Sequence, residues 1–100
     1  MTVRVDPENN ETRALLDLVD FTAQRVLEVG CGDGRLTWRY AGKAKRVTAI
    51  DPFADAITRA KESIPNKLKD RVDFRHIAFE KFAAESKPST FDRVILAWSL

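Results

Sequence analysis

The chain switches repeatedly between two spacings of hydrophobic positions, and each spacing is typical of one kind of secondary structure. Short apolar runs that end at glycine, proline or polar residues predict buried β-strands. Three such runs are clear: residues 25–29 (RVLEV), 46–50 (RVTAI) and 91–98 (FDRVILAW). A fourth, residues 72–77 (VDFRHI), is less clear and alternates between apolar and polar residues.

Helical spacing fills the intervals between these runs. Residues 53–63 place Ala56, Ile57 and Ala60 on one face, and Pro65 predicts the end of this helix. By the same reasoning we expect helices near residues 11–18, 36–40 and 80–85, the last of one or two turns.

Strands that alternate with helices predict right-handed crossovers, so the expected fold class is α/β with a Rossmann-like parallel sheet and flanking helices. If the chain winds outward from the first strand and then back, the strand order is 3-2-1-4. A ligand of such a sheet lies beyond the carboxyl ends of the strands, near the switch point between the first and fourth strands. Gly30, Asp51, Ala78 and Ala97 fall at these ends, so we expect a binding site there.

Composition narrows the class of protein. The 100 residues suffice for one small domain over residues 1–100, and 44% apolar with 32% charged residues is typical of a folded chain. A net charge of +2 is too small to indicate nucleic acid or a membrane as partner. The polar N-terminus leads us to expect a cytoplasmic protein. The single cysteine, Cys31, excludes an internal disulfide and a multi-cysteine metal site, so no metal is expected.

Residues 26–34, VLEVGCGDG, carry glycines at three alternate positions, Gly30, Gly32 and Gly34. A strand that turns directly into a helix needs glycine for positive φ and for a backbone that a ligand can approach. The helix that follows then directs its free N–H groups and positive dipole end toward the ligand. Dinucleotide-binding loops read G-x-G-x-x-G with an acidic residue about 20 positions later. Here Asp51 supplies the acidic residue, but Arg35 replaces the third glycine.

With Glu28 before it and Asp51 at the end of the next strand, this loop resembles motif I of the class I S-adenosylmethionine-dependent methyltransferases, (D/E)-x-G-x-G-x-G. AIDPF at residues 49–53 resembles the end of the family's second strand, and FDRVILAWSL at residues 91–100 resembles its fourth-strand motif. The resemblance covers the chain from about residue 6 onward. It implies S-adenosyl-L-methionine as cofactor.

The resemblance also implies roles for individual residues. Gly30 and Gly32 would contact the methionine part of the cofactor through their backbone. Glu28 would help to fix the loop and the cofactor's amino group, and Asp51 would accept hydrogen bonds from the ribose hydroxyls. The cofactor-binding residues expected on this basis are Glu28, Gly30, Cys31, Gly32, Gly34, Asp51, Pro52, Phe53, Ala78, Phe79, Ala97 and Trp98.

The resemblance also implies which residues lie near the adenine and the sulfonium of the cofactor, at the ends of the second, third and fourth strands. Phe53 lies where the family packs a side chain against adenine, and Ala97 and Trp98 lie where the family's fourth motif passes the methyl-bearing sulfonium. The third strand of the family usually ends in an acidic residue that reaches the adenine amino group. Ala78 stands at that position here, so this contact is missing unless Glu80 replaces it.

The chain ends within the fourth motif, whereas the family usually continues through three more strands. We therefore expect an incomplete class I methyltransferase fold without methyl transfer activity of its own, whose acceptor is an unidentified small molecule. The fourth strand would be an exposed apolar edge that pairs with a second copy or a partner chain. A non-catalytic half-domain that pairs in this way is the alternative function. An NAD-binding module is less favoured because of Arg35.

Other notable side chains receive structural interpretations. No general base is evident, and methyl transfer depends mainly on alignment of donor and acceptor. His76 is expected to be a packed or surface histidine, and Cys31 a small structural residue of the loop. Trp38 and Tyr40 are two apart on a helix, so one of them is expected outside the core. Solvent exposure is expected for Lys61, Lys67 and Lys69.

Overall fold

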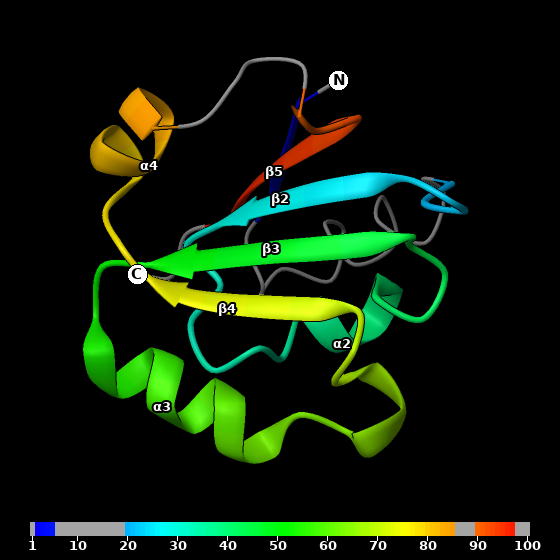
Figure 1. Cartoon of the computed structure of the whole chain (residues 1–100), viewed down its shortest axis with the longest axis horizontal. Coiled ribbons are helices and arrows are strands. Elements are labelled where there is room, and N and C mark those ends of the chain that lie inside the picture. The colour runs from blue at the N-terminus through cyan, green and yellow to red at the C-terminus, as the bar shows by residue number, and fades with distance from the viewer. Residues whose placement is uncertain (1, 6–19, 86–89, 98–100) are drawn as a thin grey trace.

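A parallel β-sheet forms the centre of the computed structural model, which describes residues 2–5, 20–85 and 90–97. Its strands stand in the order β1-β5-β2-β3-β4, and every neighbouring pair is parallel. Figure 1 shows β2, β3 and β4 side by side and running in the same direction. The strands are β1 (Thr2–Val5), β2 (Arg25–Val29), β3 (Arg46–Asp51), β4 (Val72–His76) and β5 (Arg93–Ala97).

The four strands predicted from the sequence are β2 to β5, and their order confirms the predicted 3-2-1-4 arrangement. The helices of the described residues also match the predictions to within about one residue at each end. They are α2 (Thr37–Tyr40), α3 (Ala54–Ser63) and α4 (Phe79–Glu85), with a 3₁₀ turn, η1, at Asn66–Leu68. The helix predicted near residues 11–18 lies outside the described residues.

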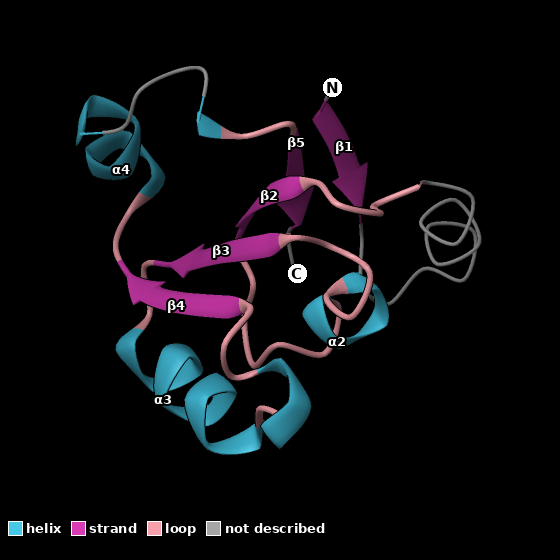
Figure 2. Ribbon diagram, turned by 45° about the vertical axis from the view of Figure 1, so that its right-hand side comes forward, coloured by secondary structure: helices cyan, strands magenta, loops and turns pink. Residues whose placement is uncertain are grey.

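The expectation that the fourth predicted strand is an exposed edge was wrong. A fifth strand, β1, pairs with β5 in register from Thr2 opposite Val94 to Val5 opposite Ala97. Figure 2 shows β1 beside β5, at the end of the sheet away from β4. Residues 2–5, TVRV, do alternate polar and apolar side chains, but only over the shortest length that indicates a strand, and this strand was not among the predicted elements.

Two apolar clusters cover the two faces of the sheet. Side chains that alternate along a strand point to opposite faces, so β2 sends Val26 and Glu28 to one face and Leu27 to the other. The larger cluster includes Val26 and packs against residues of α2 and α3, while the smaller one joins Leu27 to Phe82 of α4. The loops after the strands gather at the carboxyl edge of the sheet, where the sequence predicts the ligand site.

Ion pairing at the opposite edge fixes the starts of two strands. Asp92 accepts hydrogen bonds from the backbone N–H of Arg25 at 2.9 Å and from its guanidinium at 3.1 and 3.2 Å. The Arg25 guanidinium lowers the pKa of the Asp92 carboxyl to about 2. This contact aligns β2 with β5 and therefore the two strand ends that flank the switch point.

Candidate functional site at the carboxyl edge of the sheet

The glycine loop turns sharply as soon as β2 ends. Gly30, Gly32 and Gly34 have φ values of 82°, 57° and 91°, all in the left-handed region that favours glycine. The backbone N–H groups of Gly30 and Cys31 both donate to the carbonyl of Ile50, at 2.9 and 3.1 Å. The loop is thereby held against the end of β3, the neighbouring strand.

The three glycines are not equivalent in what surrounds them. A Cβ on Gly32 would meet no atom of the described residues within 4 Å, so the space beside it is open in that part of the chain. A Cβ on Gly34 would lie 2.5 Å from Cζ2 of Trp38. Of Gly32 and Gly34, only Gly32 leaves room for a ligand. Gly34 has no side chain because the indole ring of Trp38 occupies that space.

Asp51 joins the glycine loop to the start of α3. Its Oδ2 accepts a hydrogen bond from the backbone N–H of Gly32 at 3.0 Å, and its Oδ1 accepts one from the backbone N–H of Phe53 at 2.9 Å. The residue is only 6% exposed. The two residues joined by this carboxylate are the loop glycine with open space beside it and an exposed aromatic residue.

Glu28 lies fully buried beneath the glycine loop. Its Oε1 accepts hydrogen bonds from the hydroxyl of Thr37 at 2.9 Å and from the hydroxyl of Tyr40. Its Oε2 is buried and has no hydrogen-bond partner within the described part of the chain. Burial raises the pKa of this carboxyl to about 7, although both hydroxyls favour the ionised form.

Sequence reasoning did not assign a role to Thr37 or Tyr40. The two residues are three positions apart on α2, a spacing that places them on the same face of a helix. Both are buried, and both hydroxyls reach the same carboxylate oxygen. Two hydroxyl residues at this spacing, in the helix after a strand that carries an acidic residue, were the sequence signal that could have indicated this contact.

Cys31 is a structural residue of the loop, as expected. It is 6% exposed, and burial together with the nearby carboxylates Glu28 and Asp51 raises the pKa of its thiol. The thiol is therefore protonated at neutral pH and poorly nucleophilic.

Two exposed aromatic side chains follow the ends of adjacent strands. Phe53, after β3, is 71% exposed, and Phe79, which begins α4 after β4, is 43% exposed. Pro52 and Ala78 are exposed beside them. The N–H of Ile77 donates to the carbonyl of Asp51 at 3.1 Å, which ties these two strand ends together.

Ala97 is the remaining predicted site residue within the described ranges, and the exposed His76 lies near the same edge. His76 is exposed and its Nε2 lies 3.0 Å from the carbonyl oxygen of Pro52, in agreement with the prediction of a surface histidine. Ala97 ends β5, next to the glycine loop in the strand order. Trp98 lies outside the described residues.

One of Trp38 and Tyr40 lies outside the fully buried core, as expected, but that residue, Trp38, still packs against the core. Tyr40 is buried and stacks on Phe21 with ring centroids 4.6 Å apart. Trp38 is half-buried and meets Phe74 edge to face at 5.5 Å. The bend around Gly34 lets the indole fold back against the sheet.

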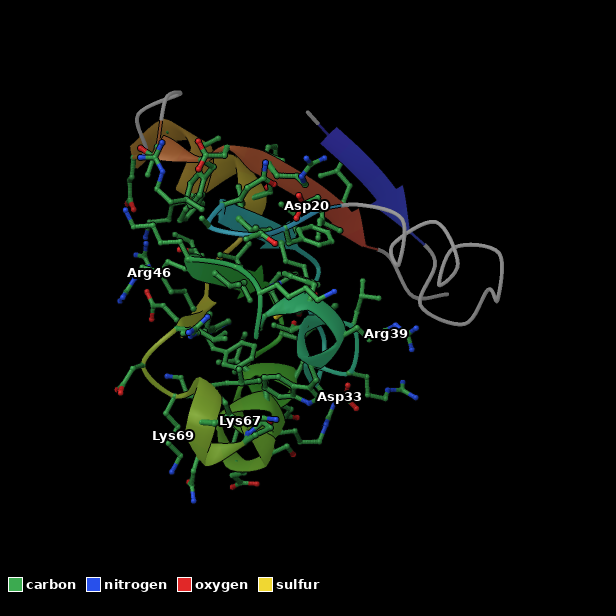
Figure 3. All side chains as sticks on the ribbon, turned by 90° about the vertical axis from the view of Figure 1, so that its right-hand side faces the viewer. Asp20, Asp33, Arg39, Arg46, Lys67 and Lys69 are labelled. Carbon is green, nitrogen blue, oxygen red and sulfur yellow. The ribbon has the colours of Figure 1, made fainter. Side chains whose placement is uncertain are left out.

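The three lysines that were expected to be exposed to solvent, Lys61, Lys67 and Lys69, are exposed. Figure 3 shows Lys67 and Lys69 beside the helical segment in the lower part of the view. Within the described ranges, no group of three or more acidic, histidine or cysteine side chains is placed to hold a metal ion. No helix of those ranges is long and apolar enough to cross a membrane.

Comparison with known proteins gives a consistent result. Residues 26–100 match the family described as Methyltransferase domain. An uncharacterised methyltransferase of Mycobacterium bovis is 37% identical over 83 residues, which make up 82% of this chain and 40% of that protein.

Solved structures show the same similarity in three dimensions. A Listeria monocytogenes protein assigned to the S-adenosylmethionine-dependent methyltransferases has a TM-score of 0.69 at 29% identity, over 84% of this chain and 38% of that one. An RNA methyltransferase of Salinibacter ruber, crystallised with S-adenosyl-L-homocysteine, has a TM-score of 0.66 at 25% identity, over 84% and 54% of the two chains. The chain thus spans about half or less of the length of these proteins.

Proposed function

This chain belongs to the S-adenosylmethionine-dependent class I methyltransferases, and we propose that the carboxyl edge of its sheet binds S-adenosyl-L-methionine for methyl transfer to an acceptor. One observation carries the proposal. Gly32 combines positive φ with open space, and its N–H is held by a carboxylate at the end of the next strand. A loop built in this way offers bare backbone to a ligand on the side where no side chain intrudes.

Different residues at this edge would contact the methionine, ribose and adenine parts of the cofactor. Gly30 and Gly32 would contact the methionine part through backbone groups. Each oxygen of Asp51 accepts one backbone hydrogen bond and has capacity for another, so ribose hydroxyls can be added without breaking the loop contacts. Phe53 is exposed enough to receive adenine on its ring.

The cofactor supplies an activated methyl group on a sulfonium, and the protein's contribution is to hold donor and acceptor in line. Ala97 ends the strand next to β2, and together with Trp98 it would lie beside the sulfonium. Ala78 has no carboxylate for the adenine amino group, and Glu80 in the first turn of α4 is the nearest acidic replacement along the chain. We therefore expect modest affinity for the adenine part.

The acceptor is proposed to be a small molecule, because the chain's net charge of +2 gives little attraction for a polyanion. The Salinibacter ruber neighbour is an RNA methyltransferase, so structured RNA is the competing acceptor class. Electrophoretic titration with a structured RNA at two salt concentrations distinguishes these two classes of acceptor. Tight, salt-dependent binding would favour RNA over the small molecule.

Calorimetric titration with S-adenosyl-L-homocysteine and, separately, with NAD tests the cofactor assignment. We expect the thioether ligand to bind more tightly than NAD. Phe53→Ala is the informative variant, because the side chain is exposed and its loss should leave the melting temperature unchanged. Stacking of a base on an aromatic ring contributes roughly 1–3 kcal/mol, so Kd should rise on the order of five- to a hundredfold.

Lys61→Ala is the control, because Lys61 is exposed and lies toward the C-terminal end of α3, the helix that Phe53 precedes. Equal or tighter binding of NAD by the wild-type chain would overturn the assignment. An unchanged Kd in Phe53→Ala would show that adenine binds elsewhere.

A further inference from the structure

Lysines gather at the amino edge of the sheet, at the opposite end of the strands from the glycine loop. Each of the two segments that lead into β3 and β4 places an exposed lysine on either side of an apolar residue of the core. The two triplets are Lys43, Ala44 and Lys45, and Lys67, Leu68 and Lys69. Figure 1 shows β3 and β4 beginning at the right of the view, and Figure 3 looks onto that side and shows Lys67 and Lys69 there.

Hydrogen bonds join the two lysine segments into one surface. The guanidinium of Arg71 donates to the carbonyls of Gly42 and Ala44, at 2.8 and 3.0 Å. In the other direction, the guanidinium of Arg46 donates to the carbonyl of Asp70 at 3.4 Å. Both arginines are thus used within the chain, whereas the lysines between them point to solvent.

Acidic residues do not balance these cations. Residues 42–46 and 66–71 hold six lysines and arginines and one carboxylate, Asp70. None of the six cations forms a salt bridge with a residue that the structure describes. The net charge of +2 for the whole chain therefore conceals a local excess of positive charge, and like charges held together in this way repel one another.

The carboxylates beside the two segments are engaged elsewhere. Asp92 is paired with Arg25, whose hydrogen bonds are the main cause of its lowered pKa, and Lys45 contributes less. The turn that follows Asp20 supplies the hydrogen bonds that lower the pKa of this carboxyl most, and Lys43 again contributes less. The lysines therefore remain available to an external anion.

The chemistry of this edge favours a phosphate backbone over other anionic partners. Within the described ranges, the exposed large apolar side chains are Phe53 and Phe79, and both lie at the opposite edge. The amino edge thus offers no exposed aromatic anchor to a protein and no platform for unpaired bases. It also offers no large apolar side chain that could insert into a membrane surface.

The shape of the amino edge favours one kind of duplex. Proteins read the major groove of DNA with a helix or a pair of strands that enters it. Neither protrudes here, because the middle residue of each lysine triplet is anchored in the core. Double-stranded RNA is recognised mainly through its shape and its phosphates, which suits a surface of fixed lysines.

We propose that the four lysines of these segments form a docking surface for the phosphate backbone of double-stranded RNA. Strands of five or six residues put roughly 15–20 Å between this surface and the cofactor edge. RNA docked here is a partner of the protein and not its methyl acceptor, so the inference goes beyond the proposed function. The excess charge lies at the amino edge and adds no attraction for a polyanion at the cofactor site.

Fluorescence anisotropy of the full chain with a labelled RNA duplex of about 20 base pairs tests the proposal. We expect a Kd in the micromolar range at about 50 mM salt. Four lysine contacts should give a slope of about −3 to −4 when the logarithm of the binding constant is plotted against that of the salt concentration. A DNA duplex of the same sequence should bind more weakly, and S-adenosyl-L-homocysteine should leave the Kd for RNA unchanged.

Lys69→Gln should weaken RNA binding roughly three- to tenfold at low salt and reduce the slope by about 1. The matched control is Lys81→Gln, which removes the same charge from an exposed position in α4, after the end of β4. It should leave the Kd for RNA within about twofold of the wild type. Replacement of all four lysines by glutamine should abolish binding and, because repulsion is relieved, should not lower the melting temperature.

The outcomes separate this inference from its competitors. If Lys81→Gln weakens binding as much as Lys69→Gln, only the net charge of the chain matters and the inference is overturned. Equal affinity for the DNA duplex would overturn the choice of RNA. Binding of phosphatidylserine vesicles in place of RNA would identify a membrane surface instead.

RNA binding that survives the loss of all four lysines would also overturn the inference, and RNA would then be a candidate acceptor at the carboxyl edge. Calorimetric titration of the same variant with S-adenosyl-L-homocysteine keeps the two questions apart. The Kd of this ligand should equal that of the wild type, because the cofactor edge is untouched.

Discussion

The indole of Trp38 occupies the place where a side chain on Gly34 would have to begin. A Cβ there would lie 2.5, 3.0 and 3.1 Å from Cζ2, Cε2 and Cη2 of Trp38, and the N–H of Trp38 donates to the carbonyl of Gly34 at 3.1 Å. The indole in turn meets Phe74 of β4 edge to face. The third glycine of the loop therefore serves packing between the loop, α2 and the sheet.

Gly34→Ala should destabilise the fold strongly. The added methyl group overpacks the indole, at about 1–3 kcal/mol, and a φ of +91° adds roughly 1–2 kcal/mol for a residue with Cβ. Urea denaturation should show a loss of roughly 2–5 kcal/mol in the free energy of unfolding.

Gly42→Ala is the control, since nothing lies within 4 Å of its Cβ position and its φ is outside the left-handed region. Its free energy of unfolding should stay within about 0.5 kcal/mol of the wild type. Adding Trp38→Ala to Gly34→Ala should remove the overpacking part of the loss. Strictly additive effects of the two substitutions would show that Gly34 and Trp38 do not interact in this way.

The buried Glu28 predicts an unusual dependence of stability on pH. Its folded-state pKa of about 7 lies above the ordinary value of 4.5, so the folded protein binds the proton more tightly than the unfolded chain. This contribution to stability is fully present below pH 4.5 and is lost as the pH rises to 7, by roughly 3 kcal/mol.

Glu28→Gln should flatten that part of the profile. The difference in free energy of unfolding between the wild type and the variant, measured from pH 4.5 to pH 8, isolates the effect from all other carboxyl groups. A difference that does not change over this range would mean that Glu28 titrates normally and that its burial is compensated by a cation.

Asp51→Ala should weaken both the fold and the cofactor site. The backbone N–H groups of Gly32 and Phe53 lose their acceptor, which should lower the free energy of unfolding by roughly 1–3 kcal/mol. Loss of charge-assisted hydrogen bonds to the ribose should raise Kd roughly ten- to a hundredfold. Calorimetric titration well below the melting temperature separates the two effects.

Asp55→Ala, in the first turn of α3, is the matched control for loss of a negative charge near the same helix start. It should leave Kd unchanged. If Asp51→Ala lowers the melting temperature while the remaining folded protein keeps its affinity, the carboxylate is only a backbone cap.

Removal of residues 1–5 should increase self-association. In the structure, β1 pairs along β5 from Thr2 to Val5, and its loss would leave the apolar strand Arg93–Ala97 with unpaired backbone groups. Such an edge favours pairing with another chain. Light scattering at several protein concentrations should show a rise in mean mass for the shortened chain.

Removal of Met1 alone is the control, because it leaves the paired residues in place. The shortened chain should also melt at a lower temperature. If it scatters as a monomer at all concentrations, the β1 pairing is not what protects the edge of the sheet.

Local sequence determined the parallel α/β sheet and brought the candidate site residues to one edge of it. Apolar runs that stop at Gly30 and Asp51 are visible without any structure, and parallel strands bring such ends to one edge. The short spacing between the glycines also predicted positive φ at Gly32, because only glycine adopts that conformation at little cost.

Tertiary packing decided which partner each of these residues has. Whether the missing side chain of a glycine leaves room for a ligand or for an indole depends on where Trp38 folds, and no local pattern encodes that. The buried contact of Glu28 with Thr37 and Tyr40 requires β2 and α2 to pack at one particular offset. The pairing of β1 with β5 joins segments about 90 residues apart. The pattern within each segment indicates a strand but does not specify which strand it pairs with, because backbone hydrogen bonds between strands form only once the fold brings them together.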